Sequence, residues 1–206
     1  DGMIITGAPL DYVPCEETLY WDEVCKIMEW TKTHVHCTFH LCWGAYAGLY
    51  YHYGIEKLDM PKKLFGIYSH EIRKETSPLF RGFNDHFLAP HSRATDVRLS
   101  DVEAIPNLEV MAVTETGSLA IAKTRDSRQF FVTCHAEYDR ETLALEYERD
   151  MKKGLTSVDL PVNYYPDDDP TKIPSMTWRA TGQLLYSNWL NFYVYQSTPY
   201  DLKEIK

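Results

Sequence analysis

The chain lacks any apolar run of about 18 residues, the length at which a membrane-spanning helix becomes the natural interpretation. It also lacks an excess of basic residues, because 21 Lys and Arg stand against 30 Asp and Glu, for a net charge of −9. Nucleic-acid-binding domains have the opposite balance. We therefore expect neither a membrane nor a nucleic-acid partner, although a local basic pocket for a phosphate-bearing small molecule stays compatible with this composition.

Cysteine is scarce as well. The five cysteines are an odd number without the short spacings of a disulfide framework, and no secretory signal is visible. These features predict a reduced, cytoplasmic protein. The chain starts with Asp rather than Met, and Met3-Ile4-Ile5 already has the character of a strand. We therefore expect the chain to be part of something longer.

The rest of the composition is typical of a globular domain, with 206 residues of which 44% are hydrophobic and 25% charged. No repeat or linker divides it, so we expect one domain over residues 1–206. Residue patterns predict strands over 3–6, 34–41, 64–68, 109–115, 119–124 and 128–133, helices over 16–32, 44–53, 140–153 and 177–196, a long loop over 75–98 and an acidic loop over 163–174. This alternation predicts an α/β sandwich around a mostly parallel sheet, with the site at the carboxyl ends of the strands.

The segment from Val35 to Ala45 combines a strand, a sharp turn and a helix. Its β-prone run stops at Cys42, Gly44 follows, and the next residues have helical spacing. A reactive side chain at such a turn is typical of a nucleophile elbow, and a helix N-terminus favours thiolate over thiol. We interpret Cys42 as a nucleophile. The alternative is an inert buried cysteine, which is the usual fate of a free thiol.

A second strand, over 128–133, is followed by Cys134-His135-Ala136-Glu137. Because His135 and Cys42 both follow carboxyl ends of strands, they are expected to meet, with His135 as base and Glu137 as the acid that orients it. Taken alone, His135 would be interpreted as a structural histidine, and Glu137 as a solvated acid on the surface. Cys134 is interpreted as a small buried thiol, with an oxidative disulfide to Cys42 as the alternative.

Metal-ligating residue types gather between residues 34 and 42. Alternation along a strand places His34, His36, His40 and Cys42 on one face. A straight strand spreads these side chains along its length, whereas a zinc site needs a closed set of ligands with turn-like spacing. We therefore expect no metal.

Several motifs together resemble one family. They are Cys42-Trp43-Gly44-Ala45, Gly48-Leu49-Tyr50-Tyr51-His52-Tyr53-Gly54, Pro90-His91-Ser92-Arg93, His135-Ala136-Glu137-Tyr138-Asp139 and Asn188-Trp189-Leu190-Asn191. In these the chain resembles the homoserine O-acyltransferases (O-acetyl- and O-succinyltransferases) of methionine biosynthesis. The resemblance extends over essentially the whole chain. It implies a class I glutamine-amidotransferase-like, flavodoxin-like fold, a three-layer α/β sandwich.

The resemblance implies a ping-pong acyl transfer to L-homoserine. Cys42 would take the acyl group from acyl-CoA as a thioester, with His135 as general base oriented by Glu137. The backbone N–H of Trp43 would stabilise the oxyanion. By position, Lys63, Ser92 and Arg149 match substrate-binding residues of the family, and arginine is well suited to hold a carboxylate. No cofactor is implied beyond acyl-CoA as co-substrate, and the implied assembly is a homodimer.

The acyl donor depends on Asp11, two positions after Gly7-Ala8-Pro9. Family members with Gly at this place tend towards succinyl-CoA and those with Glu towards acetyl-CoA. A carboxylate here should repel the free carboxylate of a succinyl group. We therefore expect acetyl-CoA as donor, with succinyl-CoA as the alternative.

The chain also departs from the family pattern. Tyr46 stands where Gln is usual, and Cys134 and Ala136 replace Gly and Pro beside the base. An N-terminal segment that supplies strands and an active-site lysine in the family is missing here. Two rival functions follow: a glutamine amidotransferase or cysteine hydrolase on the same fold, and an inactive binding module. Arg149 and His91-Ser92-Arg93 speak against the first rival.

Overall fold

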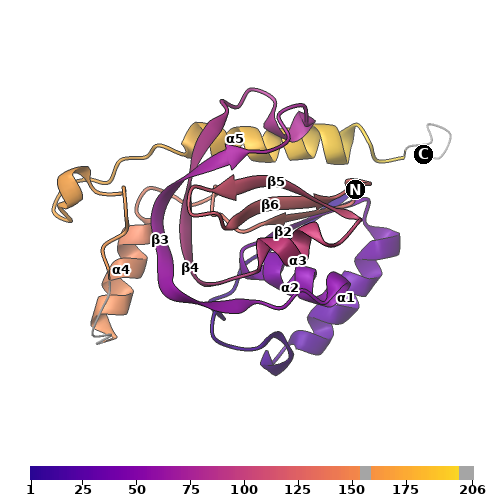
Figure 1. Ribbon diagram of the computed structural model, residues 1–206, viewed down its shortest axis with the longest axis horizontal. Helices are drawn as coiled ribbons and strands as arrows, with labels where there is room; N and C mark the ends of the chain where they lie inside the picture. The colour runs from indigo at the N-terminus through magenta and orange to yellow at the C-terminus, as the bar shows by residue number, and fades with distance from the viewer. Residues whose placement is uncertain (154–158, 200–206) are drawn as a thin grey trace, which may run out of the picture.

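The computed structural model describes residues 1–153 and 159–199. A seven-stranded sheet lies between two helical layers, with α1, α2 and α3 on one face and α5 on the other (Figure 1). The strand order is β1-β2-β7-β6-β5-β3-β4. The three-layer α/β prediction is therefore confirmed.

The strands and helices have the following bounds. The strands are β1 (Gly2–Ile5), β2 (Cys37–Leu41), β3 (Leu58–Ile72), β4 (His86–Asp96), β5 (Leu108–Thr114), β6 (Leu119–Thr124) and β7 (Gln129–Val132). The α-helices are α1 (Trp21–His34), α2 (Trp43–Tyr53), α3 (Leu99–Glu103), α4 (Thr142–Lys152) and α5 (Arg179–Asn188), and a π-helical segment, Trp189–Tyr195, continues α5. Short 3-10 turns cover Cys15–Glu17, Pro78–Phe80 and Pro166–Asp168.

Neighbouring residues of the central strands point to opposite layers. In β2, Phe39 packs in the cluster that holds the α5 side of the core, while His40 lies under α2 at Gly48. In β7, Phe130 belongs to the α5 side and Phe131 to the α2 side. Because both faces are covered, every residue of β2 is buried, and so is every residue of β7 except the half-buried Gln129.

The prediction of a mostly parallel sheet is wrong in detail. Among the described strands, β1–β2 and β2–β7 pair in parallel, whereas β7–β6, β6–β5, β5–β3 and β3–β4 pair antiparallel. The predicted hairpin through Gly117 is confirmed, and a second tight turn joins β6 to β7. Such short connections join only antiparallel neighbours, because a parallel pair needs a crossover.

The predicted loop over 75–98 is also wrong, since residues His86–Asp96 of it form β4. Its proline and charges suggested a loop, yet Pro90 pairs in register with Ile67 of β3. Strand β4 ends the strand order, and an edge strand tolerates a residue without an N–H. The predicted strand over 64–68 is correspondingly the middle of the much longer β3.

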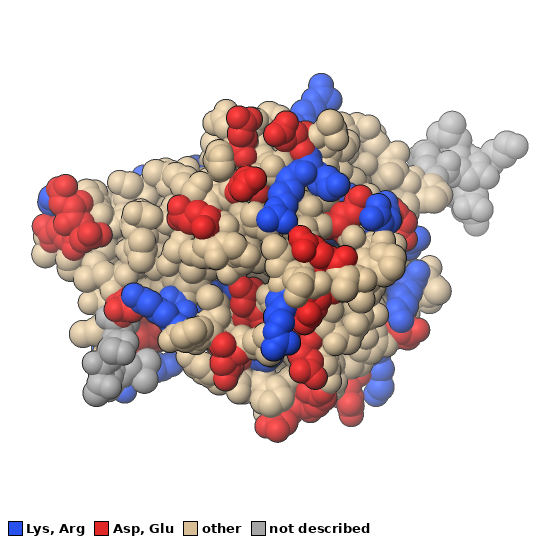
Figure 2. All heavy atoms as spheres, viewed as in Figure 1, with Lys and Arg blue, Asp and Glu red and all other residues tan. Residues whose placement is uncertain are grey.

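The remaining surface features are simple. Charges of both signs are interspersed over the face in Figure 2, and acidic side chains gather at the end of the molecule that the Pro166–Asp168 turn occupies. Asp167 and Asp168 are exposed there, as expected for a solvated loop. Among the residues that the structure describes, no helix is both long and apolar enough to cross a membrane.

Helix α5 lies unusually close to the segment that carries the predicted base. A Cβ built on Gly182 would lie 2.3 Å from the carbonyl oxygen of Ala136. We expect Gly182→Ala to destabilise the fold by about 1–3 kcal/mol, because backbone cannot yield easily, although alanine normally favours a helix. Urea unfolding checks this against Gln183→Ala on the exposed side of α5; equal midpoints for the two variants would contradict it.

Candidate active site

Cys42 sits at a strained turn between β2 and α2. It is the N-cap residue of α2 and adopts φ 52° and ψ −117°, which non-glycine residues rarely do. Its N–H donates to the carbonyl of Val132 at 2.8 Å, which fixes the turn to the end of β7. The elbow predicted from the sequence is therefore present in the fold.

Two glycines let the chain that follows β1 pass over this turn. A Cβ on Gly44 would lie 2.5 Å from the carbonyl oxygen of Ile5. A Cβ on Gly7 would lie 3.0 Å from the Cβ of Cys42 and 3.5 Å from its Sγ. The close approach holds the thiol in a narrow space beside Gly7, where Cys42 is only 9% exposed.

His135 and Glu137 form a hydrogen-bonded pair beside Cys42. The imidazole Nδ1 of His135 lies 2.7 Å from Glu137 Oε1, and the Tyr186 hydroxyl donates to Glu137 Oε2 at 3.3 Å. The His135 N–H donates to the Pro90 carbonyl at 2.8 Å, so β4 holds the base in place. Tyr186, which the sequence did not single out, thus positions the acid from α5.

The electrostatics of His135 favour its protonated form. Burial lowers the pKa of His135, but hydrogen bonds with Cys42 and Glu137 and the charges of both outweigh it and raise that pKa from 6.5 to about 10. The ring of Tyr138 stacks on the imidazole with 4.1 Å between ring centroids. The arrangement suits a thiolate–imidazolium pair oriented by a carboxylate.

Cys134, next to the base, is a different kind of thiol. It is fully buried in the core on the α5 side, and burial, with a smaller contribution from the charge of Glu137, raises its pKa to about 12. A thiol in such surroundings is inert as a nucleophile. The structure thus supports its interpretation as a small buried core residue.

One pocket of about 420 Å³ brings the candidate residues together. It is lined by seven of the eight site residues predicted from the sequence: Asp11, Cys42, Lys63, Ser92, His135, Glu137 and Arg149. The side chain of Trp43 instead packs between α2 and α1, so only its backbone N–H, at the start of α2, is at the elbow. Residues far apart in sequence therefore share one site.

Part of the wall of this pocket is charged. Lys63 Nζ lies 3.3 Å from Asp150 Oδ2, and Arg149 donates to Asp150 Oδ1 at 2.9 Å. Hydrogen bonds and charges from Arg149 and Lys63 lower the pKa of Asp150, although burial opposes them. Asp150 thus holds two cations side by side at the pocket wall, a role that its sequence position did not reveal.

Glu146 also lines the pocket and escaped the sequence analysis. Its Oε1 accepts from the Tyr138 hydroxyl at 2.8 Å, whereas its Oε2 is buried and has no hydrogen-bond partner within residues 1–153 and 159–199. Glu146 and Arg149 are three residues apart on α4, so they share one face of the helix. That spacing was visible in the sequence, but only the pocket shows that the pair faces a ligand space.

Arg93 is buried in the sheet rather than a surface charge. Its Nη1 lies 3.0 Å from Asp96 and its Nε donates to His91 Nδ1 at 3.2 Å. His91 Nε2 and His70 Nε2 lie 2.8 Å apart, and His70 Nδ1 lies 3.2 Å from the Phe87 carbonyl. Burial lowers the pKa of His70 to about 4 and that of His91 well below its usual range, so both rings are neutral.

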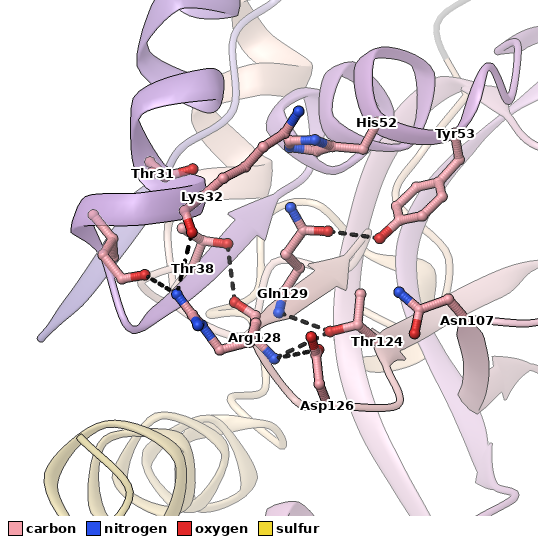
Figure 3. A pocket seen from close by; sticks show the side chains of 11 residues that line it. Thr31, Lys32, Thr38, His52, Tyr53, Asn107, Thr124, Asp126, Arg128 and Gln129 are labelled. Carbon is pink, nitrogen blue, oxygen red and sulfur yellow. Dashed lines mark hydrogen bonds between the residues drawn. The ribbon is translucent and has the colours of Figure 1, made fainter. Parts of the chain in front are cut away.

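A second pocket, of about 280 Å³, lies at the opposite end of the sheet (Figure 3). Thr38 and Gln129, which line it, begin the β2–β7 pairing that ends just before Cys42. Many of its polar groups bond within the protein: Tyr53 donates to Gln129 at 2.7 Å, and Arg128 donates to the Val35 carbonyl at 2.7 Å. It is therefore separate from the Cys42 pocket.

Comparisons with known proteins identify the family of the chain. The sequence model of the homoserine O-succinyltransferase family matches residues 1–200. A homoserine O-acetyltransferase of Agathobacter rectalis is 55% identical over 201 residues, which are 98% of this chain and 64% of the relative. One of Acetivibrio thermocellus is 53% identical over 206 residues, 100% of this chain and 67% of the relative. The chain thus spans about two thirds of the length of these relatives.

Solved structures with low sequence identity share the fold. A glutamine amidotransferase of Thermotoga maritima has a TM-score of 0.63 at 13% identity, covering 91% of this chain and 76% of that chain. One of Methylobacillus flagellatus has a TM-score of 0.59 at 12% identity, covering 84% and 70%. The amidotransferase-like architecture is thereby confirmed, and the family match over nearly all of the sequence shows that the chain belongs to the homoserine O-succinyltransferase family.

Proposed function

We propose that the protein is an acyl-CoA:L-homoserine O-acyltransferase that works by a ping-pong mechanism with acetyl-CoA as donor. The observation that carries this proposal is the shared pocket, which is lined both by the Cys42–His135–Glu137 constellation and by the Glu146–Arg149 pair. Membership of the family and the acetyltransferase names of its relatives support the same activity.

In the first half-reaction, the Cys42 thiolate attacks the thioester carbonyl of acetyl-CoA. A new C–S bond forms to Cys42, the C–S bond to coenzyme A breaks, and the leaving thiolate takes a proton from His135. The backbone N–H of Trp43, at the start of α2, stabilises the oxyanion. The acyl group then rests on Cys42 while coenzyme A departs.

In the second half-reaction, neutral His135 takes the proton of the homoserine hydroxyl, whose oxygen attacks the Cys42 thioester. The C–S bond breaks, the O-acyl ester forms, and the Cys42 thiolate returns beside a protonated His135. Glu137 orients the imidazole through Nδ1, at 2.7 Å. One histidine serves both steps because the same pocket takes the two substrates in turn.

Recognition of homoserine falls to the charged end of the pocket. Arg149 presents a guanidinium to the amino-acid carboxylate, and Lys63 adds a second cation. Glu146 Oε2, which has no hydrogen-bond partner among the described residues, matches the ammonium group, and Ser92 lines the same pocket. Paired recognition of both charges suits an amino acid, which favours an amino-acid substrate over a hydrolase of another substrate class and over a binding module. Glutamine carries the same two charges, so homoserine is favoured over glutamine by the family match and not by this pair.

The remaining parts of the proposal follow the family. No cofactor takes part beyond acyl-CoA as co-substrate, the cell compartment is the cytoplasm, and the assembly is a homodimer. Asp11 in the pocket favours an acetyl over a succinyl donor.

Mass spectrometry of the intact protein checks the thioester. Acetyl-CoA alone should add one acetyl group, which homoserine then removes, because the nucleophile keeps the acyl group between the half-reactions. Cys42→Ser should abolish the homoserine-labile adduct, whereas Cys25→Ser, at a half-buried thiol on α1, should keep it. An adduct of the parent size on Cys42→Ser would refute the route through Cys42.

Steady-state kinetics check the acceptor site. We expect Glu146→Gln to raise KM for homoserine about 10- to 100-fold, since it removes the charge that faces the ammonium while Gln can still accept from Tyr138. Glu148→Gln, on the exposed side of the same helix, should leave KM within about twofold of the parent. Similar KM values for the two variants would exclude this role of Glu146.

The pKa of His135 predicts how stability depends on pH. A group whose pKa rises from 6.5 to about 10 on folding adds stability that is complete below pH 6.5 and is lost as the pH approaches 10. We expect His135→Gln to lower the free energy of unfolding by about 3 kcal/mol near pH 6 and by much less near pH 10. Urea titrations at both pH values test this, with His86→Gln, at an exposed residue, as control. A deficit that widens with pH would contradict it.

A further inference from the structure

Tyr138 touches both the base and Glu146 in the active-site pocket. Its ring stacks on the imidazole of His135, with 4.1 Å between the ring centroids and 21° between the planes, and its hydroxyl donates to Glu146 Oε1 at 2.8 Å. These two groups have separate tasks in the proposed transfer, since His135 moves protons and Glu146 faces the ammonium of the acceptor. Tyr138 joins them physically.

Packing and main-chain contacts hold the Tyr138 ring independently of its hydroxyl. Fully buried Trp178 donates from Nε1 to the Tyr138 carbonyl at 2.9 Å, and the Tyr138 N–H donates to the His135 carbonyl at 3.2 Å. The ring also packs against the buried cluster that contains Trp178 and Leu143. The hydroxyl is therefore free to hold Glu146, and because burial and the charge of Glu146 raise its pKa, it stays protonated and donates.

The stack restricts the imidazole in a way that Glu137 alone does not. The hydrogen bond between Glu137 and Nδ1 fixes one direction in the ring but leaves the ring free to turn about that bond. A face packed against Tyr138 removes this freedom, so the opposite edge of the imidazole stays directed at Cys42. An aromatic face also favours a positively charged ring over a neutral one, and His135 is protonated whenever Cys42 is a thiolate.

We propose that Tyr138 is a positioning residue with two separable tasks. Its ring holds the His135 imidazole in the orientation that serves Cys42, and its hydroxyl holds the Glu146 carboxylate where the acceptor ammonium binds. The base and the acceptor site are thereby kept in register by one side chain. This inference rests on the proposed acyl transfer to homoserine and adds to it a residue that acts in both half-reactions through its neighbours.

Two substitutions at Tyr138 separate the ring from the hydroxyl. Tyr138→Phe removes only the hydroxyl. We expect it to leave the rate of acetylation by acetyl-CoA within about twofold of the parent and to raise KM for homoserine about three- to tenfold, the effect of one hydrogen bond to a carboxylate. Tyr138→Leu removes the aromatic ring as well and should also slow acetylation about tenfold or more, because the base is no longer held. Intact mass spectrometry gives the acetylation rate, and steady-state kinetics give KM.

The split between the two rates distinguishes positioning from a structural role. A residue that only stabilised the fold would change acetylation and KM together, and phenylalanine would not restore one of them alone. Tyr147→Phe, which removes a half-buried hydroxyl one residue after Glu146 on α4, is the matched control and should leave both values near the parent.

A double variant tests the bond to Glu146 directly. Once Glu146→Ala has removed the acceptor of the hydrogen bond, adding Tyr138→Phe should raise KM for homoserine no further, because the effects of residues in contact are not additive. Should Tyr138→Leu fold poorly, Tyr138→Met removes the aromatic ring in a second way.

A further readout does not depend on acyl transfer. Alkylation of Cys42 by iodoacetamide at pH 7 should be about three- to tenfold slower in Tyr138→Leu than in the parent and unchanged in Tyr138→Phe, since only the ring supports the imidazolium. Equal losses of acetylation in the Phe and Leu variants, additive KM effects in the double variant, or parent-like alkylation of Tyr138→Leu would overturn the inference. If the parent forms no adduct with acetyl-CoA but alkylation follows the expected pattern, the proposed function fails while the positioning of His135 by Tyr138 stands.

Discussion

The turn at Cys42 is the constraint on which the site depends. A residue at φ 52° stays at this place only because the surroundings hold it there, through the hydrogen bond to Val132 and the close passage of residues 5–7 over Cys42 and Gly44. The same contacts join β1, β2 and β7, the three strands that pair in parallel. The contacts that hold the strained turn at Cys42 are therefore also contacts between the parallel strands.

The antiparallel part of the sheet supports the site from the other side of the pocket wall, through β3 and β4. β4 holds the His135 backbone through Pro90 and presents Ser92 to the pocket. Its buried Arg93 is oriented by two neutral histidines, His91 and His70, and the hydrogen bonds determine the tautomer of each ring. Because Arg93 donates to His91 Nδ1, the proton of His91 is on Nε2, which donates to His70 Nε2. His70 therefore carries its proton on Nδ1 and donates it to the Phe87 carbonyl. The β3–β4 ribbon at the edge of the sheet thus contains a buried network of hydrogen-bonded polar side chains.

Local signals in the sequence predicted the parts of the fold that depend on neighbours along the chain. The elbow at Cys42, helix α2 with its end at Gly54, and the hairpin at Gly117 all have nearby glycines and clear periodicity. Strand β4 was not predicted because its proline and charged residues suggest a loop. In the fold, Pro90 lies on an edge strand and the charge of Arg93 is paired with Asp96. Tyr186 and Asp150 were missed for a related reason, since their roles arise from tertiary contacts with side chains more than 40 residues away. Patterns along a chain do not report such contacts.

Pro90 has a consequence for how the protein meets other chains. An edge strand offers a row of unpaired N–H and C=O groups that another strand can extend into a larger sheet. At Pro90 the edge has no N–H to give, and its carbonyl is already taken by the His135 N–H. The peptide bond that holds the base is thereby also a stop against strand addition, so the chemistry of the site and resistance to aggregation along β4 reside in the same residue.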